Sequence, residues 1–511
     1  MGAWSINFDD WRIMENHEEE HHHHHHSSHN KSTGAKIWRW AEILLTAVQG
    51  IVSLLLIISL INTGIVAVWL MIILIILLAG LLALNIWMLF IKKHSSKAMK
   101  IICPIIAALI VIGGIFALRY TDAFNSFLNK ITKLNAETKG YSVVVMDESE
   151  INDLQELSGK SMGFLKIDEQ SAKAEQYLQN KVQFEADYYD DLDTMMSALS
   201  KNITDAVVLE TDRLEMLKEE VEEEMAKTRV IYTFEIEIDQ ELEASAKEVT
   251  KDPFITYISG SDSRTGIKTT ARSDVNILAV VNPKQGKILL VSIPRDTYVQ
   301  LHNTTGLKDK LTHAGVYGID MSKKTIEDFL DTKIDHTLKV SFDTVVKVVD
   351  QLDGIDITSD QAMTLKTNGK TCEFIEGTQH VDGDCALRFA RERKKYKTGD
   401  RHRGENQQQV ITSIINRLSG SKDYVLKLPT ILDIAADSFE TSLSRDDITS
   451  FIRMQLADSI DWQVESIAVD GTGTMEPTYS MGANRPLYVM IPSEDSVKNA
   501  KEKIDEYLQS E

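Results

Sequence analysis

Cysteine is scarce in this 511-residue chain, and several common catalytic motifs are missing from it. The three cysteines, Cys103, Cys372 and Cys385, show no CxxC spacing, which excludes the usual zinc-binding arrangements. The sequence has neither a GxSxG nucleophile elbow nor a GxxxxGK[ST] phosphate loop, which excludes serine hydrolases of that type and P-loop enzymes. The formal net charge is −21, and the one segment rich in basic residues, Ala386–Val410, lacks the interleaved aromatic residues of a single-strand binder. We therefore expect no nucleic-acid partner.

The N-terminal part combines a tag-like segment with three long apolar runs. Six consecutive histidines at His21–His26 resemble an affinity tag, so we assign residues 1–35 to a tag and a cytoplasmic N-terminus rather than to a metal site. Within residues 36–120 the apolar runs are Trp40–Ile61, Ile65–Ile91 and Ile101–Leu118. Crossing a membrane takes roughly 20 helical residues, and three all-apolar helices in succession are unusual in a soluble core. The sequence therefore predicts three transmembrane helices.

The charges beside these runs predict the orientation of the chain. Lys31, Lys36 and Arg39 precede the first run, four lysines lie between the second and third, and the link between the first and second has no charge. By the positive-inside rule, the N-terminus is cytoplasmic and everything after Tyr120 is extracellular. No charged residue lies at membrane depth, which argues against a transporter. We interpret the helices as a multi-pass anchor in the plasma membrane, in contact with its lipid.

Two domains are expected after the anchor, because about 390 residues exceed one ordinary core. We place an α/β accessory domain at residues 121–250. Its expected strands are Tyr141–Met146, Gly163–Ile167, Val182–Ala186, Asp205–Leu209 and Arg229–Ile236, with helices at Ser171–Gln179, Asp191–Ser200 and Asp212–Lys227. It shows no cluster of catalytic residue types, and its acidic run Glu219–Glu224 is interpreted as a solvated helix face.

The second domain, residues 251–511, is predicted to be α/β, with a mixed sheet between helical layers. Val275–Asn282 and Ile288–Ser292 read as strands joined by a Pro-Lys-Gln-Gly turn, which is typical of a hairpin. Helices are expected at Ser322–Leu330, Phe342–Leu352, Glu405–Leu418 and Val497–Tyr507. Cys372 and Cys385 could close a loop as a disulfide, since such bonds persist outside the cell, or remain two buried thiols.

Ala386–Val410 concentrates positive charge in this acidic chain. Arg388, Arg391, Arg393, Arg401 and Arg403 fall within sixteen residues. A solvated basic helix face is the ordinary explanation for such a cluster. Here, however, apolar residues are interleaved with the arginines, as on an element that lies half in the core. Guanidinium groups match pairs of phosphate oxygens, so the segment predicts an anion site, with phosphate as the ligand.

Further polar residues are expected at the ends of neighbouring strands, where ligands bind in open α/β sheets. Asp262 follows one strand and Asp274 precedes the next, which would suit Mg²⁺ held by carboxylates and phosphate oxygens. A lone aspartate in a loop more often caps a turn. Arg295 ends another strand, and Lys310 and His313 lie downstream of it. Because a lone histidine is usually a hydrogen-bonding residue, we do not assign His313 as a base.

These segments together resemble the LytR–CpsA–Psr family. The motifs SGSD, ARSDVNIL, SIPRDTYV, KDKLTHAGVYG, DGIDI, ALRFARER and GDRHRGENQQQV occur in this order between Ile255 and Leu418. The three apolar runs and the additional domain resemble its streptococcal capsule-type CpsA branch. The resemblance implies a Mg²⁺-dependent transfer of a glycopolymer from a polyprenyl-pyrophosphate carrier to peptidoglycan, outside a Gram-positive bacterium.

The resemblance also implies roles for individual residues. Arg272, Arg295, Arg391, Arg393, Arg403 and Gln407 would contact the pyrophosphate. We predict that Lys310 also binds the substrate, and that Asp274, Arg295, Arg391 and Arg393 are the catalytic residues. Asp262 and Asp274 would serve the metal, and Asp274 or a metal-bound water would take the acceptor proton. Arg388, Lys394, Lys395 and Lys397 are left as surface charge.

The polymer is expected to be a capsular polysaccharide, with capsule synthesis and export proteins as further partners. Two alternatives remain open from the sequence. One is a non-catalytic polyprenyl-phosphate-binding regulator of capsule synthesis, and the other is a lipid pyrophosphatase.

Overall fold

The structure is a computed structural model, and it divides the chain into two compact units. The residues it describes are 29–90, 99–132, 137–166, 169–238, 245–261, 267–367, 370–397, 399–420 and 439–509. One unit consists of Met1–Leu55 and Leu74–Ile115, and the other of Leu56–Ile73 and Phe116–Glu511. The tag-like histidines His21–His26 and the expected metal residue Asp262 lie outside the described residues.

The N-terminal helices are long and apolar enough to cross a membrane. They are α1 (His29–Thr63), α2 (Val68–Phe90) and α3 (Met99–Ile131), with candidate spans at Ile37–Thr63, Val68–Phe90 and Ile101–Ile131. Large apolar side chains such as Ile76 and Ile112 are exposed on them, each at 66%. That exposure is costly in water and favourable in lipid. Between α1 and α2, the buried Asn85 amide donates a 2.7 Å hydrogen bond to Gln49, a contact that helps to hold membrane helices together.

Helix α3 continues further than the apolar run predicted. The expected third span ended at Leu118, whereas the helix ends at Ile131. Phe124, Leu128 and Ile131 of its last turns are buried against partly buried apolar residues, among them Phe439 and Ile452. The segment after Leu118 is amphipathic rather than uniformly apolar, so it does not continue the apolar run that predicts the third span.

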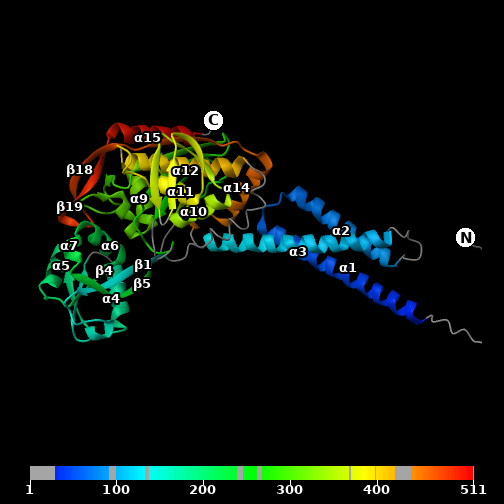
Figure 1. The fold of residues 1–511 in the computed structure, drawn as a ribbon, viewed down its shortest axis with the longest axis horizontal. Helices are drawn as coiled ribbons and strands as arrows, with labels where there is room; N and C mark the ends of the chain where they lie inside the picture. Colours follow the sequence, from blue (N-terminus) through cyan, green and yellow to red (C-terminus); the bar gives the residue numbers. More distant parts are fainter. Residues whose placement is uncertain are drawn as a thin grey trace, which may run out of the picture. The chain divides into compact units, whose positions relative to one another are not determined.

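The first α/β layer contains a five-stranded sheet. Its strands are β1 (Glu137–Met146), β2 (Ser161–Leu165), β3 (Glu185–Tyr189), β4 (Ala206–Glu210) and β5 (Thr228–Ile238), in the order β3-β2-β4-β1-β5. The helices are α4 (Glu169–Gln179), α5 (Leu192–Ser200), α6 (Thr211–Glu220) and α7 (Glu222–Met225), and Figure 1 shows them around the sheet. Two predictions were wrong in detail. Strand β3 begins three residues later than expected, and the single helix expected at Asp212–Lys227 is interrupted at Val221.

The second α/β layer contains a mixed six-stranded sheet. Its strands are β6 (Phe254–Ser261), β7 (Val275–Asn282), β8 (Lys287–Ser292), β11 (His336–Ser341), β16 (Phe439–Thr441) and β17 (Gln463–Ala468), in the order β16-β11-β6-β7-β8-β17. Strands β7 and β8 form the predicted antiparallel hairpin, whereas β11 is parallel to β6 and β17 is parallel to β8. The prediction of an α/β fold with a mixed sheet is confirmed.

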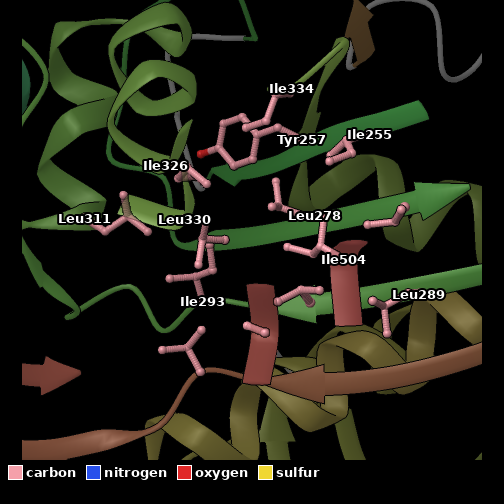
Figure 2. Packing of buried hydrophobic residues seen from close by; sticks show 14 of the residues in the cluster. Ile255, Tyr257, Leu278, Leu289, Ile293, Leu311, Ile326, Leu330, Ile334 and Ile504 are labelled. Atoms are coloured by element: carbon pink, nitrogen blue, oxygen red, sulfur yellow. The ribbon is translucent and has the colours of Figure 1, made fainter. Parts of the chain in front are cut away.

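Alternation along the central strands creates two apolar faces, each covered by helices. Tyr257 and Leu278 belong to the core that packs under α9 (Ile319–Leu330) and α15 (Glu494–Leu508), as Figure 2 shows. Phe254 and Ile277 belong to the opposite core, beneath α12 (Asp400–Gly420) and α14 (Arg445–Asp458). Because successive residues of a strand point to opposite faces, the near-continuous apolar runs of β6 to β8 supply both cores.

Smaller elements complete this layer. The remaining strands are β9 (Tyr298–Val299), β10 (Asp309–Lys310), β12 (Ile355–Ser359), β13 (Met363–Thr367), β14 (Lys370–Phe374), β15 (Gly377–Val381), β18 (Gly471–Thr478) and β19 (Gly482–Pro492). The remaining helices of this layer are α8 (Leu311–Ala314), η2 (Gly315–Tyr317), α10 (Phe342–Gln351) and α11 (Gly383–Ala390). The first layer has one further short helix, η1 (Leu154–Leu157). The β18–β19 hairpin and α14 were not predicted.

A disulfide joins Cys372 of β14 to Cys385 near the start of α11, with 5.5 Å between their Cα atoms. Of the two alternatives left by the sequence, the structure has the bonded one. The bridge ties α11, which leads into the arginine segment, to the hairpin that precedes it.

Replacing both cysteines by serine is expected to lower the free energy of unfolding by about 3 kcal/mol, because the open loop gains conformational entropy in the unfolded chain. Thermal unfolding of oxidised and reduced protein would measure the effect. Cys103→Ser is the matched control, since this buried cysteine is free. An unchanged unfolding temperature on reduction would contradict the prediction.

Candidate functional site

Asp274 lies at the edge of the second sheet where β6 ends and β7 begins. Its backbone N–H donates a 2.8 Å hydrogen bond to the carbonyl of Gly260, and Gly260 pairs with Val275. The preceding residues 271–273 pack closely against Gly315. A Cβ on Gly315 would lie 2.4 Å from the Ala271 oxygen, so only glycine fits there. The expected adjacency of the two strand ends is confirmed, while a metal role for Asp262 stays a prediction.

Arg295 extends the same edge from the end of β8. Its guanidinium Nη1 contacts the Asp274 carboxylate at 2.6 Å, and its Nε lies 3.6 Å from Asp296. Lys310 approaches the same Asp296 carboxylate at 3.4 Å. Lys310 and Asp296 are both buried. The orientation of Arg295 is therefore fixed by two carboxylates, those of Asp274 and Asp296.

Helices α11 and α12 bring the arginine segment to this edge. Arg391 caps the C-terminus of α11, and its guanidinium lies 4.8 Å from the centre of the Phe342 ring. Arg403 and Gln407 are one turn apart on α12 and largely buried. Between them, a Cβ on Gly404 would lie 2.6 Å from the Ser292 hydroxyl, so glycine lets α12 approach β8 closely.

These elements enclose a cavity of about 810 Å³. Its lining includes most of the site residues predicted from the sequence, namely Arg272, Asp274, Arg295, Arg391, Arg393, Arg403 and Gln407. The lining also includes Arg388 and Lys394, which the sequence left as surface charge. Arg388 is paired with the buried Glu392 at 3.0 Å, so this arginine faces the cavity but is already neutralised.

Lys310 is the exception among the described residues predicted for the site, because it is not part of the lining. Its ammonium is directed to Asp296 instead. The geometry therefore indicates that Lys310 supports Arg295 through their shared carboxylate rather than touching a ligand itself.

Sequence similarity identifies the family of the chain. The sequence profile described as the LytR_cpsA_psr family matches residues 214–504. The chain belongs to the LytR–CpsA–Psr family. It is 32% identical over 247 residues to the polyisoprenyl-teichoic acid–peptidoglycan teichoic acid transferase TagU of Halalkalibacterium halodurans, covering 48% of this chain and 76% of that protein. With TagU of Bacillus subtilis it shares 35% identity over 206 residues, covering 40% of this chain and 65% of the relative.

A similar solved structure is that of B. subtilis TagV. It shares 28% of its residues with this chain, covers 50% of this chain and 98% of its own, and has a TM-score of 0.42.

The accessory layer of this LytR–CpsA–Psr protein also contributes to the cavity, which the sequence did not predict. Helix α6 supplies Thr211, Asp212, Glu215 and Glu219 to the lining. The prediction of a solvated face is wrong for Glu219, because both of its carboxylate oxygens accept hydrogen bonds from Arg272, at 2.7 and 2.8 Å. The spacing of the three acidic residues puts them on one side of a helix. Nothing in the sequence shows that this side meets the arginines of another domain.

The ion pairs determine which charges persist in the cavity. Hydrogen bonding to Glu219 raises the pKa of Arg272, and the same contact lowers the pKa of Glu219. Burial lowers the pKa of Arg403 and raises that of its partner Asp400, which lies 2.5 Å away. Burial also opposes the charge of Arg295, yet Asp274 and Asp296 outweigh it and raise that pKa. Arg272, Arg295 and Arg403 therefore remain cationic at neutral pH.

Asp212 is the residue of the lining whose charge changes near neutral pH. Burial, with the nearby Glu210 charge, raises the pKa of Asp212 to about 7. The carboxyl is neutral below that pH, and above it adds a negative charge close to Arg272. We expect the affinity for inorganic pyrophosphate to fall by about two- to fivefold as the pH rises through 7, the size of a partly solvated charge interaction.

Isothermal titration calorimetry between pH 6 and 8 would measure this change. Asp212→Asn removes the carboxylate without altering the ionisation of the ligand, so its curve serves as the reference. Parallel pH profiles of the wild type and Asp212→Asn would show that Asp212 does not titrate in this range.

His313 has an ordinary structural role. Its Nδ1 lies 2.6 Å from Asp309 Oδ1 and 2.8 Å from Ser480 Oγ, and all three residues are buried. Because both neighbours meet the same ring nitrogen, the three do not form a relay of the Ser-His-Asp type. Not assigning His313 as a base is consistent with these contacts.

The donor set around Asp274 is sparse for a metal. Among the described residues, no three or more histidine, cysteine or acidic side chains are grouped to hold an ion. Mg²⁺ does not need such a group, because it takes one or two carboxylates together with phosphate oxygens and waters. One Asp274 oxygen pairs with Arg295, and the carboxylate is 20% exposed in the cavity wall. A Mg²⁺ that arrives with a phosphate ligand fits the described residues around Asp274.

Proposed function

We propose that this protein is a membrane-anchored transferase that moves a glycopolymer from a polyprenyl-pyrophosphate carrier to peptidoglycan. The observation that carries the proposal is a single cavity lined by arginines from three parts of the chain, with Asp274 at its wall. Two relatives are named polyisoprenyl-teichoic acid–peptidoglycan teichoic acid transferases, which supports both the carrier and the acceptor. A capsular polysaccharide is our proposal for the polymer, from the resemblance to the CpsA branch.

The proposed reaction breaks the phosphoanhydride bond of the carrier's pyrophosphate and forms a phosphate ester bond to the acceptor. A sugar hydroxyl of peptidoglycan attacks the phosphorus next to the glycan, and a new P–O bond forms. The bond from this phosphorus to the bridging oxygen breaks, and polyprenyl phosphate leaves with the electron pair. The hydroxyl proton passes to a base, for which the proposed group is the Asp274 carboxylate or a metal-bound water. Such a transfer depends mainly on positioning and on neutralising oxygen charge.

The arginines supply that neutralisation. Arg295 is held between Asp274 and Asp296, so its orientation is set before a ligand enters. Arg391 and Arg393 border the cavity from the α11 side, and Arg403 with Gln407 from α12. Donors fixed in advance stabilise a transition state more than donors that must reorganise. Asp274, together with Asp262, would hold a Mg²⁺ that supplies further positive charge to the pyrophosphate.

The proposed location is the outer surface of the plasma membrane, with capsule synthesis and export proteins as neighbours. Three helices can span the membrane, and the lysines between the second and third runs favour a cytoplasmic position for that link. With three spans, both α/β layers then lie outside, where peptidoglycan is.

A single incubation tests the function against its two alternatives. Full-length protein in detergent is mixed with lipid-linked polymer, MgCl₂ and peptidoglycan, and the polymer is followed. Polymer attached to peptidoglycan supports the transferase. Polymer released as free phosphate would indicate a lipid pyrophosphatase instead, and tight binding without turnover would indicate a regulator. Omission of MgCl₂ with added chelator is expected to abolish attachment if the metal proposal holds.

A further inference from the structure

Glu219 makes a contact that the proposed reaction does not use. It lies in α6 of the accessory layer, yet both carboxylate oxygens contact the two terminal nitrogens of Arg272. A carboxylate paired in this forked geometry presents oxygens as a phosphate does. Glu219 is 55% exposed on its side chain, whereas Arg272 is only 22% exposed. The anionic partner is thus the more solvated member of the pair.

The position of Glu219 is unfavourable within its own helix. It stands in the last turn of α6, next to Glu220 and close to the acidic start of α7. Negative charge is destabilising at a helix C-terminus, where the backbone carbonyls are already partly negative. The cations of the cavity compensate, since Arg272, Arg295 and Lys310 all lower the pKa of Glu219. The Glu219 carboxylate is therefore stabilised by the cations of the cavity and not by its own helix.

Arg272 is poised to exchange one anion for another. Its backbone is fixed, because Ser273 N–H bonds to the Thr312 carbonyl at 3.1 Å and Gly315 packs against residues 271–273. Only the side chain beyond that fixed backbone has to turn. Because Glu219 is 55% exposed, the ion pair is partly solvated and contributes modestly to stability, so replacing Glu219 by a more highly charged ligand costs little.

We propose that Glu219 occupies the anion position of Arg272 until the pyrophosphate of the carrier binds, and that α6 thereby sets how tightly the cavity holds that carrier. The proposal rests on the proposed function and extends it to the accessory layer. Glu219 is a positioning residue, which keeps Arg272 oriented toward the cavity and is displaced by the incoming phosphate oxygens.

Binding of geranyl pyrophosphate to the full-length protein in detergent tests this exchange. Glu219→Gln is expected to tighten the Kd by about two- to fivefold, the size of an exposed ion pair, because Arg272 no longer has to leave a charged partner. Glu219→Asp keeps the charge on a shorter side chain and should not tighten the Kd as Glu219→Gln does. In the transfer assay, Glu219→Gln should lower KM with kcat little changed. Glu223→Gln, at an exposed acid of α7, is the control for a mere change of net charge.

Combining Glu219→Gln with Arg272→Ala shows whether the effect of Glu219 on binding acts through Arg272. With Arg272→Ala, binding weakens, and adding Glu219→Gln should change nothing further. A purely structural role for the ion pair would instead make Glu219→Gln weaken binding, which would overturn the inference. Equal tightening by Glu223→Gln, or tightening that persists without Arg272, would overturn it as well. If the wild type itself fails to bind geranyl pyrophosphate, both this inference and the proposed function fail. If the wild type binds geranyl pyrophosphate and Glu219→Gln does not change the Kd, the proposed exchange is wrong, while the proposed function still stands.

Discussion

Arg391→Ala is expected to abolish attachment of polymer to peptidoglycan while the protein still folds and inserts. The guanidinium lines the cavity and lies over the Phe342 ring at 4.8 Å, at the C-cap of α11. The Arg391 residue is exposed, so its truncation leaves no void in the core. Loss of one fixed donor to a transition-state oxyanion typically costs about 10²–10³-fold in kcat, and a comparable loss is expected here. The transfer assay with purified protein measures it directly.

Three further variants make the result specific. Lys395→Ala removes a neighbouring positive charge that is not part of the cavity lining, and transfer should continue at nearly the wild-type rate. Asp274→Ala should fail as Arg391→Ala does, because Arg295 loses its 2.6 Å carboxylate and the proposed metal loses a ligand. Arg391→Lys keeps the charge but loses the planar fork, and intermediate activity is expected. Wild-type amounts of linked polymer in Arg391→Ala would contradict the proposed site.

The convergence of Arg272, Asp274 and Arg295 could be predicted because it depends on strand ends. Strands β7 and β8 are near-continuous apolar runs joined by a turn, and both lead to polar residues at the same edge. Such a hairpin places the residue before the first strand beside the residues after the second. The arginines of α11 and α12 could be predicted separately, because they lie in a motif of their own, and they line the same cavity. For these residues, local pattern and tertiary position coincide.

The contribution of α6 could not be predicted, since it depends on the packing of one layer against another. Asp212 and Glu219 carry the periodicity of any solvated helix face. Arg213 in the same helix donates hydrogen bonds to the Ser480 carbonyl and the Tyr317 hydroxyl, residues more than 100 positions away. Contacts of that kind leave no trace in local sequence. Helix α14 was also not predicted, although Ser444 and Asp447 form a capping box at its start, a pattern typical of a helix N-terminus.

Glu210 is central to that packing, and its removal is expected to have a large effect on stability. Its two carboxylate oxygens contact Lys139 at 2.5 Å and Arg213 at 3.1 Å, and all three residues are buried. Replacing one member of a buried charge network by alanine typically costs about 3–5 kcal/mol, because the remaining charges keep the cost of desolvation. Glu210→Ala should lower the free energy of unfolding by this amount. Glu215→Ala, in an exposed pair with Lys218 on the same helix, should cost at most about 0.5 kcal/mol.

The pH dependence of unfolding provides a second measurement on Glu210. Burial alone would raise the pKa of this carboxyl, but Lys139 and Arg213 outweigh burial and lower it to about 2 from the ordinary 4.5. A lowered pKa in the folded state means that the stabilisation is complete above pH 4.5 and is lost as the pH falls toward 2. The difference in unfolding temperature between the wild type and Glu210→Gln should therefore shrink over that interval. A difference that stays constant from pH 6 to pH 2 would show that the Glu210 charge does not stabilise the contact between the two layers.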